Sequence, residues 1–285
     1  ARRGPGLPAG ERRRFGWARA PRSVDLPCPA MIPIRDENPR RTAPVVNIAL
    51  IALNVAVWLV EWLVLSRGSD AVISGYGLVP ARLLADPGAD AITVVTSMFL
   101  HGSWGHLLGN VLFLHVFGDN VEDALGHGRY LAFYLLAGLA AALAQIGIDP
   151  GSAIPMVGAS GAIAGVLGAY LVLYPRAPIV VLNPVFPLWF VFGVLLSFPA
   201  WFVVGEWFVW NLLRGVASLS LPTTGGVAFF AHLGGFVLGL LAVRPFMTGR
   251  ERRRAKPWHG FRASPGERPR VEEDRGGPRR DPWAW

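Results

Sequence analysis

The chain has 285 residues, of which 52% are hydrophobic and 16% charged, and its formal net charge is +8. A mean hydropathy of +0.40 is typical of an integral membrane protein and argues against a soluble globular domain. Ten of the 27 Lys and Arg residues precede Val46 and twelve lie from Arg244 onward, so basic charge flanks the apolar region. This distribution fits a membrane topology signal and argues against nucleic-acid binding. The single cysteine, Cys28, excludes an internal disulfide framework.

The N-terminal residues 1–43 are predicted to be a disordered basic segment, because Arg, Pro and Gly recur there without an apolar period. Residues 1–30 lack the apolar core of a secretion signal. The composition changes at Met31. We expect Met31 to be the natural start of the protein and residues 1–30 to be a non-native extension.

Residues 44–245 are predicted to form an all-α membrane domain of six transmembrane helices. Each helix needs about 20 apolar residues to cross a hydrocarbon core of ~30 Å. The intervening segment 66–105 is apolar but broken by Gly and Pro, so we expect it to lie at the membrane interface. Residues 246–285 read as a disordered basic tail. The six predicted spans are 44–65, 104–121, 130–148, 159–174, a span within 187–213, and 225–243.

An even number of spans places both termini on one side of the membrane. The Arg-rich ends, Arg129 and Arg176 all fall on that side, which the positive-inside rule identifies as cytoplasmic. The basic C-terminal tail is compatible with a bacterial plasma membrane. Ser160 would then lie toward the extracytoplasmic side.

Ser160 lies between Gly158 and Gly161 at the start of the fourth predicted helix. Such a serine could simply cap or pack a membrane helix. Alternatively, backbone N–H groups and the helix dipole could make it a nucleophile with a stabilised oxyanion. The helix over residues 159–174 is about 24 Å long, shorter than the ~30 Å core, so Ser160 would be submerged beside an aqueous opening.

His232 lies about 10 Å into the sixth predicted helix, a depth similar to that of Ser160. Gly161 and Gly165 on one helix, and Gly235 and Gly239 on the other, have the spacing that lets backbones approach closely in lipid. The glycines could serve packing alone, and a membrane histidine could be structural. Close packing would nevertheless bring a serine and a general base within reach.

His106 and Asn110 are four residues apart and therefore share a helix face. Both can donate hydrogen bonds to an oxyanion at Ser160, together with the Ser160 N–H. The histidine spacings do not stack metal ligands on one face, and no intramembrane carboxylate or cysteine completes a site, so we expect neither metal nor cofactor.

These motifs together resemble the rhomboid family of intramembrane serine proteases over roughly residues 44–245. The resemblance implies a Ser160–His232 dyad, an oxyanion hole of His106, Asn110 and the Ser160 N–H, and single-pass membrane proteins as substrates. The four motifs occur in the family's order: His106-Leu-Leu-Gly-Asn110, Gly118-Asp-Asn-Val-Glu122-Asp-Ala-Leu-Gly126, Gly158-Ala-Ser160-Gly161 and Ala231-His232-Leu-Gly-Gly235-Phe-Val-Leu-Gly239.

The chain also departs from the family pattern. An aromatic residue that stacks on the dyad histidine in some members is Ala164 here, so the base must be oriented by another group. Ile92 and Thr93 replace a Trp-Arg pair of the first loop. Glu206 is expected in the outer half of the fifth span, facing water.

Two alternative functions stay open: a rhomboid-like protein that binds transmembrane clients without cleaving them, and a transporter. Besides transmembrane substrates, the expected partner is the lipid bilayer. The sequence does not indicate an oligomeric state.

Overall fold

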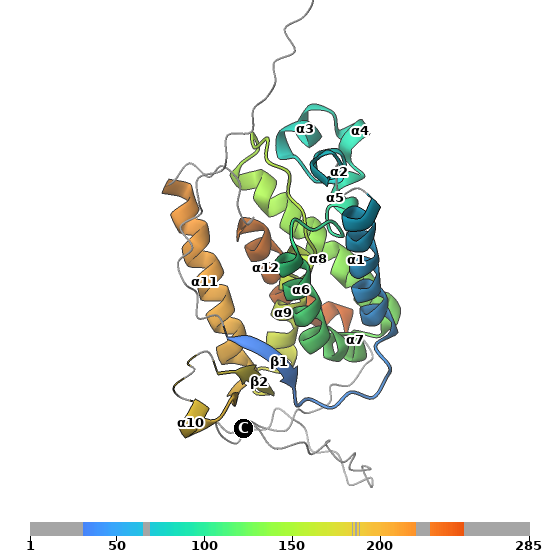
Figure 1. Cartoon of the computed structure of the whole chain (residues 1–285). Helices are drawn as coiled ribbons and strands as arrows, with labels where there is room; N and C mark the ends of the chain where they lie inside the picture. Colours follow the sequence, from blue (N-terminus) through green and yellow to red (C-terminus); the bar gives the residue numbers. More distant parts are fainter. Residues whose placement is uncertain are drawn as a thin grey trace, which may run out of the picture.

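The structure is a computed structural model that describes residues 31–64, 69–183, 185, 187, 189–220 and 229–247, and these residues are mostly helical (Figure 1). Within this part of the chain, α1, α8 and α12 are long and apolar enough to cross a membrane, and α9 is a shorter apolar helix. These helices give the chain the character of an integral membrane protein. The longest helices are α1 (Val45–Val64), α8 (His127–Ile148), α9 (Ser160–Leu173), α11 (Ala200–Ser220) and α12 (Phe229–Phe246).

The second predicted span is a helical stretch with a π-helical turn in its middle. It consists of α6 (Trp104–Phe113), the π-turn η1 (Leu114–Gly118) and α7 (Asp119–Leu125). Asn47 of α1 lies against this turn and donates from Nδ2 to the Leu114 carbonyl at 2.9 Å. A Cβ atom on Gly118 would lie 2.1 Å from Asn47 Oδ1, so only glycine leaves room for this side chain. An inserted side chain is a recognised cause of such an irregular turn.

The segment before α6 is broken into four short helices that cluster at one end of the bundle (Figure 1). Backbone hydrogen bonds join this segment to the loop before α9: Leu78 pairs with Met156 at 3.0 and 2.8 Å, and Gly158 N–H donates to the Ser97 carbonyl at 2.8 Å. The loop that precedes Ser160 is therefore held in place at two points, Met156 and Gly158. The short helices are α2 (Ser69–Tyr76), α3 (Pro80–Ala85), α4 (Pro87–Asp90) and α5 (Thr93–Thr96).

The core of the bundle is α9, which packs against α8 and α12 through small residues. A Cβ atom on Gly235 would lie 2.0 Å from the Gly161 carbonyl oxygen, and one on Gly239 would lie 2.1 Å from that of Gly165. The backbones of α9 and α12 are thus in direct contact, an approach that larger side chains would prevent. Any residue other than glycine at these two positions would push the helices apart.

The domain is not purely helical, which corrects the all-α prediction. A three-stranded antiparallel sheet in the order β1-β2-β3 is formed by β1 (Ile32–Asp36), β2 (Pro178–Leu182) and β3 (Leu195–Pro199). The short apolar runs of β2 and β3 are too brief to be told from helix by periodicity alone. The short helix α10 (Trp189–Phe192) lies between them, so the fifth long helix begins at Ala200, later than the predicted 187–213.

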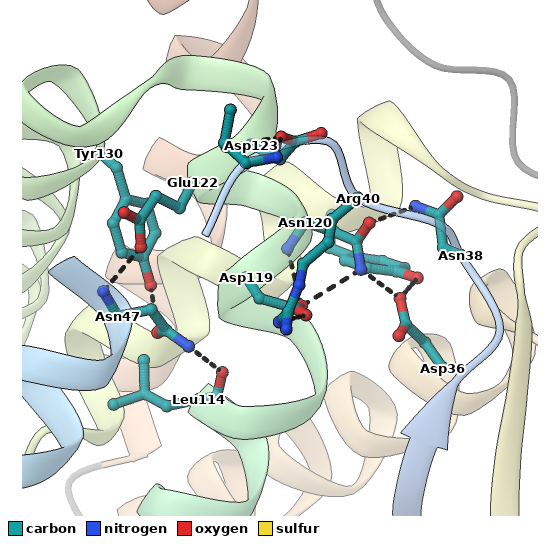
Figure 2. A network of polar contacts seen from close by, with 12 residues as sticks. Asp36, Asn38, Arg40, Asn47, Leu114, Asp119, Asn120, Glu122, Asp123 and Tyr130 are labelled. Carbon is teal, nitrogen blue, oxygen red and sulfur yellow. Dashed lines mark hydrogen bonds and ion pairs between the residues drawn. The ribbon is translucent and has the colours of Figure 1, made fainter. Parts of the chain in front are cut away.

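Residues 32–43, which we predicted to be disordered, are held by a polar network (Figure 2). Arg40 pairs with Asp119 at 2.8 Å, and Asn38 Nδ2 donates to Asn120 Oδ1 at 2.9 Å. The Asp36 carboxylate accepts from Tyr170 of α9 at 2.7 Å. Composition indicated disorder because these partners are far away in the sequence. The predictions for residues 1–30 and for most of the tail 246–285 lie outside the described residues.

Glu206 lies in the second turn of α11. Its carboxylate accepts hydrogen bonds from the backbone N–H of Met31 and from the side chain of Trp210. Since Met31 adjoins β1, Glu206 lies toward the end of α11 that is next to the sheet. Its predicted place in the outer half of the span depends on the orientation in the membrane and stays a prediction.

Asp36 gives the polar network a predictable dependence on pH. Burial, and in addition the nearby Asp119 carboxylate, raises the pKa of Asp36 well above its usual range. The stability that this group contributes is therefore full below the unfolded-state pKa and is lost as pH rises through the folded-state pKa. Asp36→Asn keeps an oxygen for Tyr170 and Asn120 but cannot ionise. We expect the melting temperature of this variant to fall less than that of the wild type between about pH 5 and about pH 8.

Thermal unfolding in detergent, followed by tryptophan fluorescence, measures this difference. Glu37→Gln is a matched control, because the Glu37 carboxylate forms a long, partly exposed ion pair with Arg35 at 3.8 Å. It should leave the pH profile of the wild type unchanged. An Asp36→Asn variant that is as sensitive to pH as the wild type would contradict the assignment.

Candidate active site

Ser160 is the first residue of α9, and the loop before it has a conformation that requires glycine. Gly158 has φ +118°, in the region that residues with a Cβ rarely adopt. A Cβ atom here would also lie 2.5 Å from His106 Nε2. Both the backbone conformation and the space beside His106 therefore require glycine at this position. The turn brings the backbone of the loop against α6 and presents Ser160 at the start of its helix.

His232 lies on α12, with Nε2 2.7 Å from Ser160 Oγ, although the two residues are 72 positions apart in the chain. The ring is largely buried, with 8% of the residue exposed. The glycine contacts between α9 and α12 account for this proximity, because Gly161 follows Ser160 directly and Gly235 lies about one turn from His232. A serine hydroxyl and an imidazole at this distance have the geometry of a nucleophile and its base.

The other side of the His232 ring is held by α11, which the sequence analysis missed. Asn211 Oδ1 lies 2.6 Å from His232 Nδ1, and the Trp207 ring centroid lies 5.8 Å from that of His232 with a 40° tilt. Ala164, whose methyl group cannot stack on the ring, is fully buried in the core cluster. The signal that could have revealed Asn211 is a polar residue on the helix adjacent to α12.

His106 and Asn110 approach the same loop from α6. The helix begins at Ser103, whose side chain accepts from the His106 N–H at 3.2 Å and so caps the first turn. A Cβ atom on Gly158 would lie 3.7 Å from Asn110 Nδ2 as well as against the His106 ring. Both side chains therefore lie beside the loop that leads into Ser160.

His101 fixes the amide of Asn110. Asn110 Nδ2 lies 3.0 Å from His101 Nε2, and His101 Nδ1 lies 3.2 Å from the Phe99 carbonyl oxygen. A carbonyl can only accept, so His101 carries its proton on Nδ1 and accepts from Asn110 through Nε2. One amide hydrogen of Asn110 is thus engaged by His101, and the second is left for another acceptor.

A small cavity adjoins Ser160 and leaves about 40 Å³ for the centres of water-sized molecules. Its walls are mostly apolar and include Met98, Gly138, Met156 and Ala231. In the part of the chain that the structure describes, no three His, Cys, Asp or Glu side chains converge as a metal site would require.

Glu122, from the second motif, does not join this group. Its carboxylate accepts from the backbone N–H groups of Val46 and Asn47 at 3.0 and 2.7 Å, and it pairs with His127. It thereby caps the start of α1, where a negative charge is favoured by the helix dipole. Of the predicted site residues, Ser160, His232, His106 and Asn110 come together, whereas Glu122 lies elsewhere and joins α7 to α1.

Comparison with known proteins identifies the family to which the chain belongs. The Rhomboid domain family matches residues 89–248, which is more than half of the chain. Rhomboid protease AarA of Providencia stuartii is 28% identical over 213 residues, covering 68% of this chain and 70% of the relative. Putative rhomboid protease YdcA of Bacillus subtilis is 31% identical over 141 residues, covering 48% and 68%. Rhomboid protein 1, mitochondrial, of Saccharomyces cerevisiae is 31% identical over 154 residues, and the matched region spans 53% of this chain and 40% of the yeast relative's length.

The fold and these matches define a membrane protein of the helical, rhomboid-like class. The chain belongs to the rhomboid family. The resemblance noted in the sequence motifs is thereby confirmed, and several of the relatives are named as proteases.

Proposed function

We propose that this chain is an intramembrane serine endopeptidase that cleaves single-pass membrane proteins in or near their transmembrane segments. The observation that carries the proposal is the 2.7 Å separation of His232 Nε2 and Ser160 Oγ at the start of an apolar helix. The relatives named as rhomboid proteases support the same reaction class.

In the proposed reaction, Ser160 Oγ attacks the carbonyl carbon of a peptide bond while its proton passes to His232 Nε2. The resulting tetrahedral oxyanion accepts hydrogen bonds from the Ser160 N–H, His106 and the second amide hydrogen of Asn110. Collapse of the intermediate breaks the C–N bond, and His232 returns its proton to the departing amine. A water then attacks the acyl ester by the same route, which releases the carboxylate product and restores Ser160.

The substrate class follows from the chemistry of a peptide bond in a membrane. Helical hydrogen bonds shield the carbonyl, and an unsatisfied backbone group in lipid is costly, so the scissile segment must unravel locally before attack. Segments that contain Gly or other weak helix formers meet this requirement most easily. The small cavity beside Ser160 suits a compact side chain next to the cleaved bond.

The proposal includes six membrane spans, formed by α1, the α6–α7 stretch, α8, α9, α11 and α12. Both termini would be cytoplasmic in a bacterial plasma membrane, with the sheet on that side and Ser160 toward the other. The positive-inside distribution of Arg and Lys supports this orientation. Cysteine labelling of single-cysteine variants from each side of intact cells tests the orientation.

The decisive experiment reconstitutes the wild type and Ser160→Ala in liposomes with a model single-pass substrate. We expect the wild type to cleave the substrate and to react with a fluorophosphonate probe, and Ser160→Ala to do neither. Cleavage that survives Ser160→Ala would rule out the mechanism. Binding of several substrates by the wild type without cleavage of any would instead indicate a rhomboid-like client-binding protein.

A further inference from the structure

The imidazole of His232 is held at both nitrogens, and the bond at the rear nitrogen fixes where its proton lies. Asn211 Nδ2 donates to the Trp207 carbonyl at 2.8 Å, so the amide must direct Oδ1 toward His232. An amide oxygen can only accept, so the 2.6 Å contact requires a proton on His232 Nδ1. The lone pair of Nε2 then faces Ser160 Oγ, which is the state that a general base needs.

Trp207 and Asn211 are one helical turn apart and form the wall of α11 that faces the His232 ring. The Trp207 centroid lies 5.8 Å from that of His232 and 6.2 Å from that of Phe236, one turn further along α12. The tryptophan restricts the ring from one face, and the asparagine fixes its rotation about χ2. Together they supply the orientation that Ala164 of α9 cannot provide.

α11 lies at the edge of the bundle and is joined to it differently from the α9–α12 pair (Figure 1). A Cβ atom on Gly205 would meet nothing within 4 Å, and the nearest atoms to one on Gly215 would be side-chain atoms of Phe229 and Phe230. The opposite side of the helix is exposed, with Val209 51% exposed and Trp201 55% exposed. Backbone hydrogen bonds from Ala200 and Trp201 anchor the start of α11. The orientation of His232 therefore depends on a peripheral helix that contacts α12 through side chains.

We propose that Asn211 is a positioning residue for His232, which makes the catalytic unit a Ser160–His232–Asn211 arrangement drawn from three helices. The proposal rests on the proposed protease function for its consequence in catalysis. Its structural content, the Nδ1–H tautomer of His232, can be measured separately. An amide in this role is neutral, so it selects the tautomer without placing a second charge in the buried site.

The kinetic test compares three variants with the wild type in liposomes. Asn211→Leu has a similar volume but no acceptor, which leaves the buried Nδ1–H unpaired. We expect kcat to fall about 10- to 100-fold with KM within about threefold, because substrate contacts are unchanged. Asn211→Asp keeps an oxygen acceptor and should restore kcat to within about fivefold of the wild type. Val209→Ala shortens an exposed residue of the same helix and should leave both constants unchanged.

The second readout is the ¹⁵N spectrum of histidine-labelled protein, which reports the tautomer without any turnover. The chain has six histidines, and the signals lost in His232→Ala assign this ring. We expect Nδ1–H in the wild type and in Asn211→Asp, and loss of that preference in Asn211→Leu. An unchanged tautomer in Asn211→Leu, or a kcat within threefold of the wild type, would overturn the proposal. If the wild type cleaves nothing, the tautomer alone decides the role of Asn211, and only the protease function is rejected.

Discussion

Alanine at either Ser160 or His232 is expected to lower the rate of peptide-bond cleavage by at least about 10³-fold. Ser160→Ala removes the attacking oxygen, and His232→Ala leaves the hydroxyl without the base that lies 2.7 Å away. Because the two groups act as a unit, the double variant should be no slower than the slower single variant by more than a few-fold. Initial rates in liposomes at saturating substrate measure all three.

The comparison is valid only if the variants fold. The contacts that hold α9 and α12 together are made mainly by their glycines and not by the side chains of Ser160 and His232. Both variants should therefore retain the helical signal of the wild type. Melting temperature in the same detergent provides the control. Losses that multiply in the double variant would show that the two residues do not act in one step.

His106→Ala and Asn110→Ala are each expected to lose roughly 10²–10³ in kcat with little change in KM. Each variant removes one donor that we assign to the oxyanion, a group that carries charge only in the transition state. Asn110 is the sharper test, since His101 engages one amide hydrogen and directs the other away from itself. Single-turnover cleavage of the same liposome substrate separates this effect from product release.

Leu108→Ala is the matched control for these two variants, because Leu108 lies between them on α6 and is 60% exposed. It should cleave at a rate within about twofold of the wild type. Losses below threefold at both His106 and Asn110 would show that other donors form the oxyanion hole. A large loss for His101→Ala combined with a small one for Asn110→Ala would point to the same conclusion.

Several helices of this fold could be predicted from the sequence because each is specified by its own residues. The predicted spans 44–65, 130–148 and 159–174 match α1, α8 and α9 closely, since long apolar runs fix both the type and the approximate ends of a membrane helix. The sequence also suggested the pairing of Ser160 with His232, because glycines at i and i+4 on two helices favour close packing.

The sheet and the ordered N-terminal segment could not be predicted in this way. β1 contains only five residues, and its strand partner β2 lies far along the chain. The residues that follow it are polar and are ordered by Asp119, Asn120 and Asp123 of α7, so their composition alone suggests a disordered segment. The start of α11 was also predicted too early, because the residues of β3 are apolar enough to be read as helix.

By itself, the sequence determined the class of membrane protein and singled out Ser160 and His232 as a candidate pair, and the side of the membrane on which they lie stays a prediction. Only the tertiary structure decided how that base is held. The sequence showed that Ala164 could not stack on His232, but it could not show that Asn211 and Trp207 replace that contact. A hydrogen bond of 2.6 Å depends on the rotation and depth of α11 relative to α12, and these are set by side-chain packing between helices rather than by the local pattern of either one.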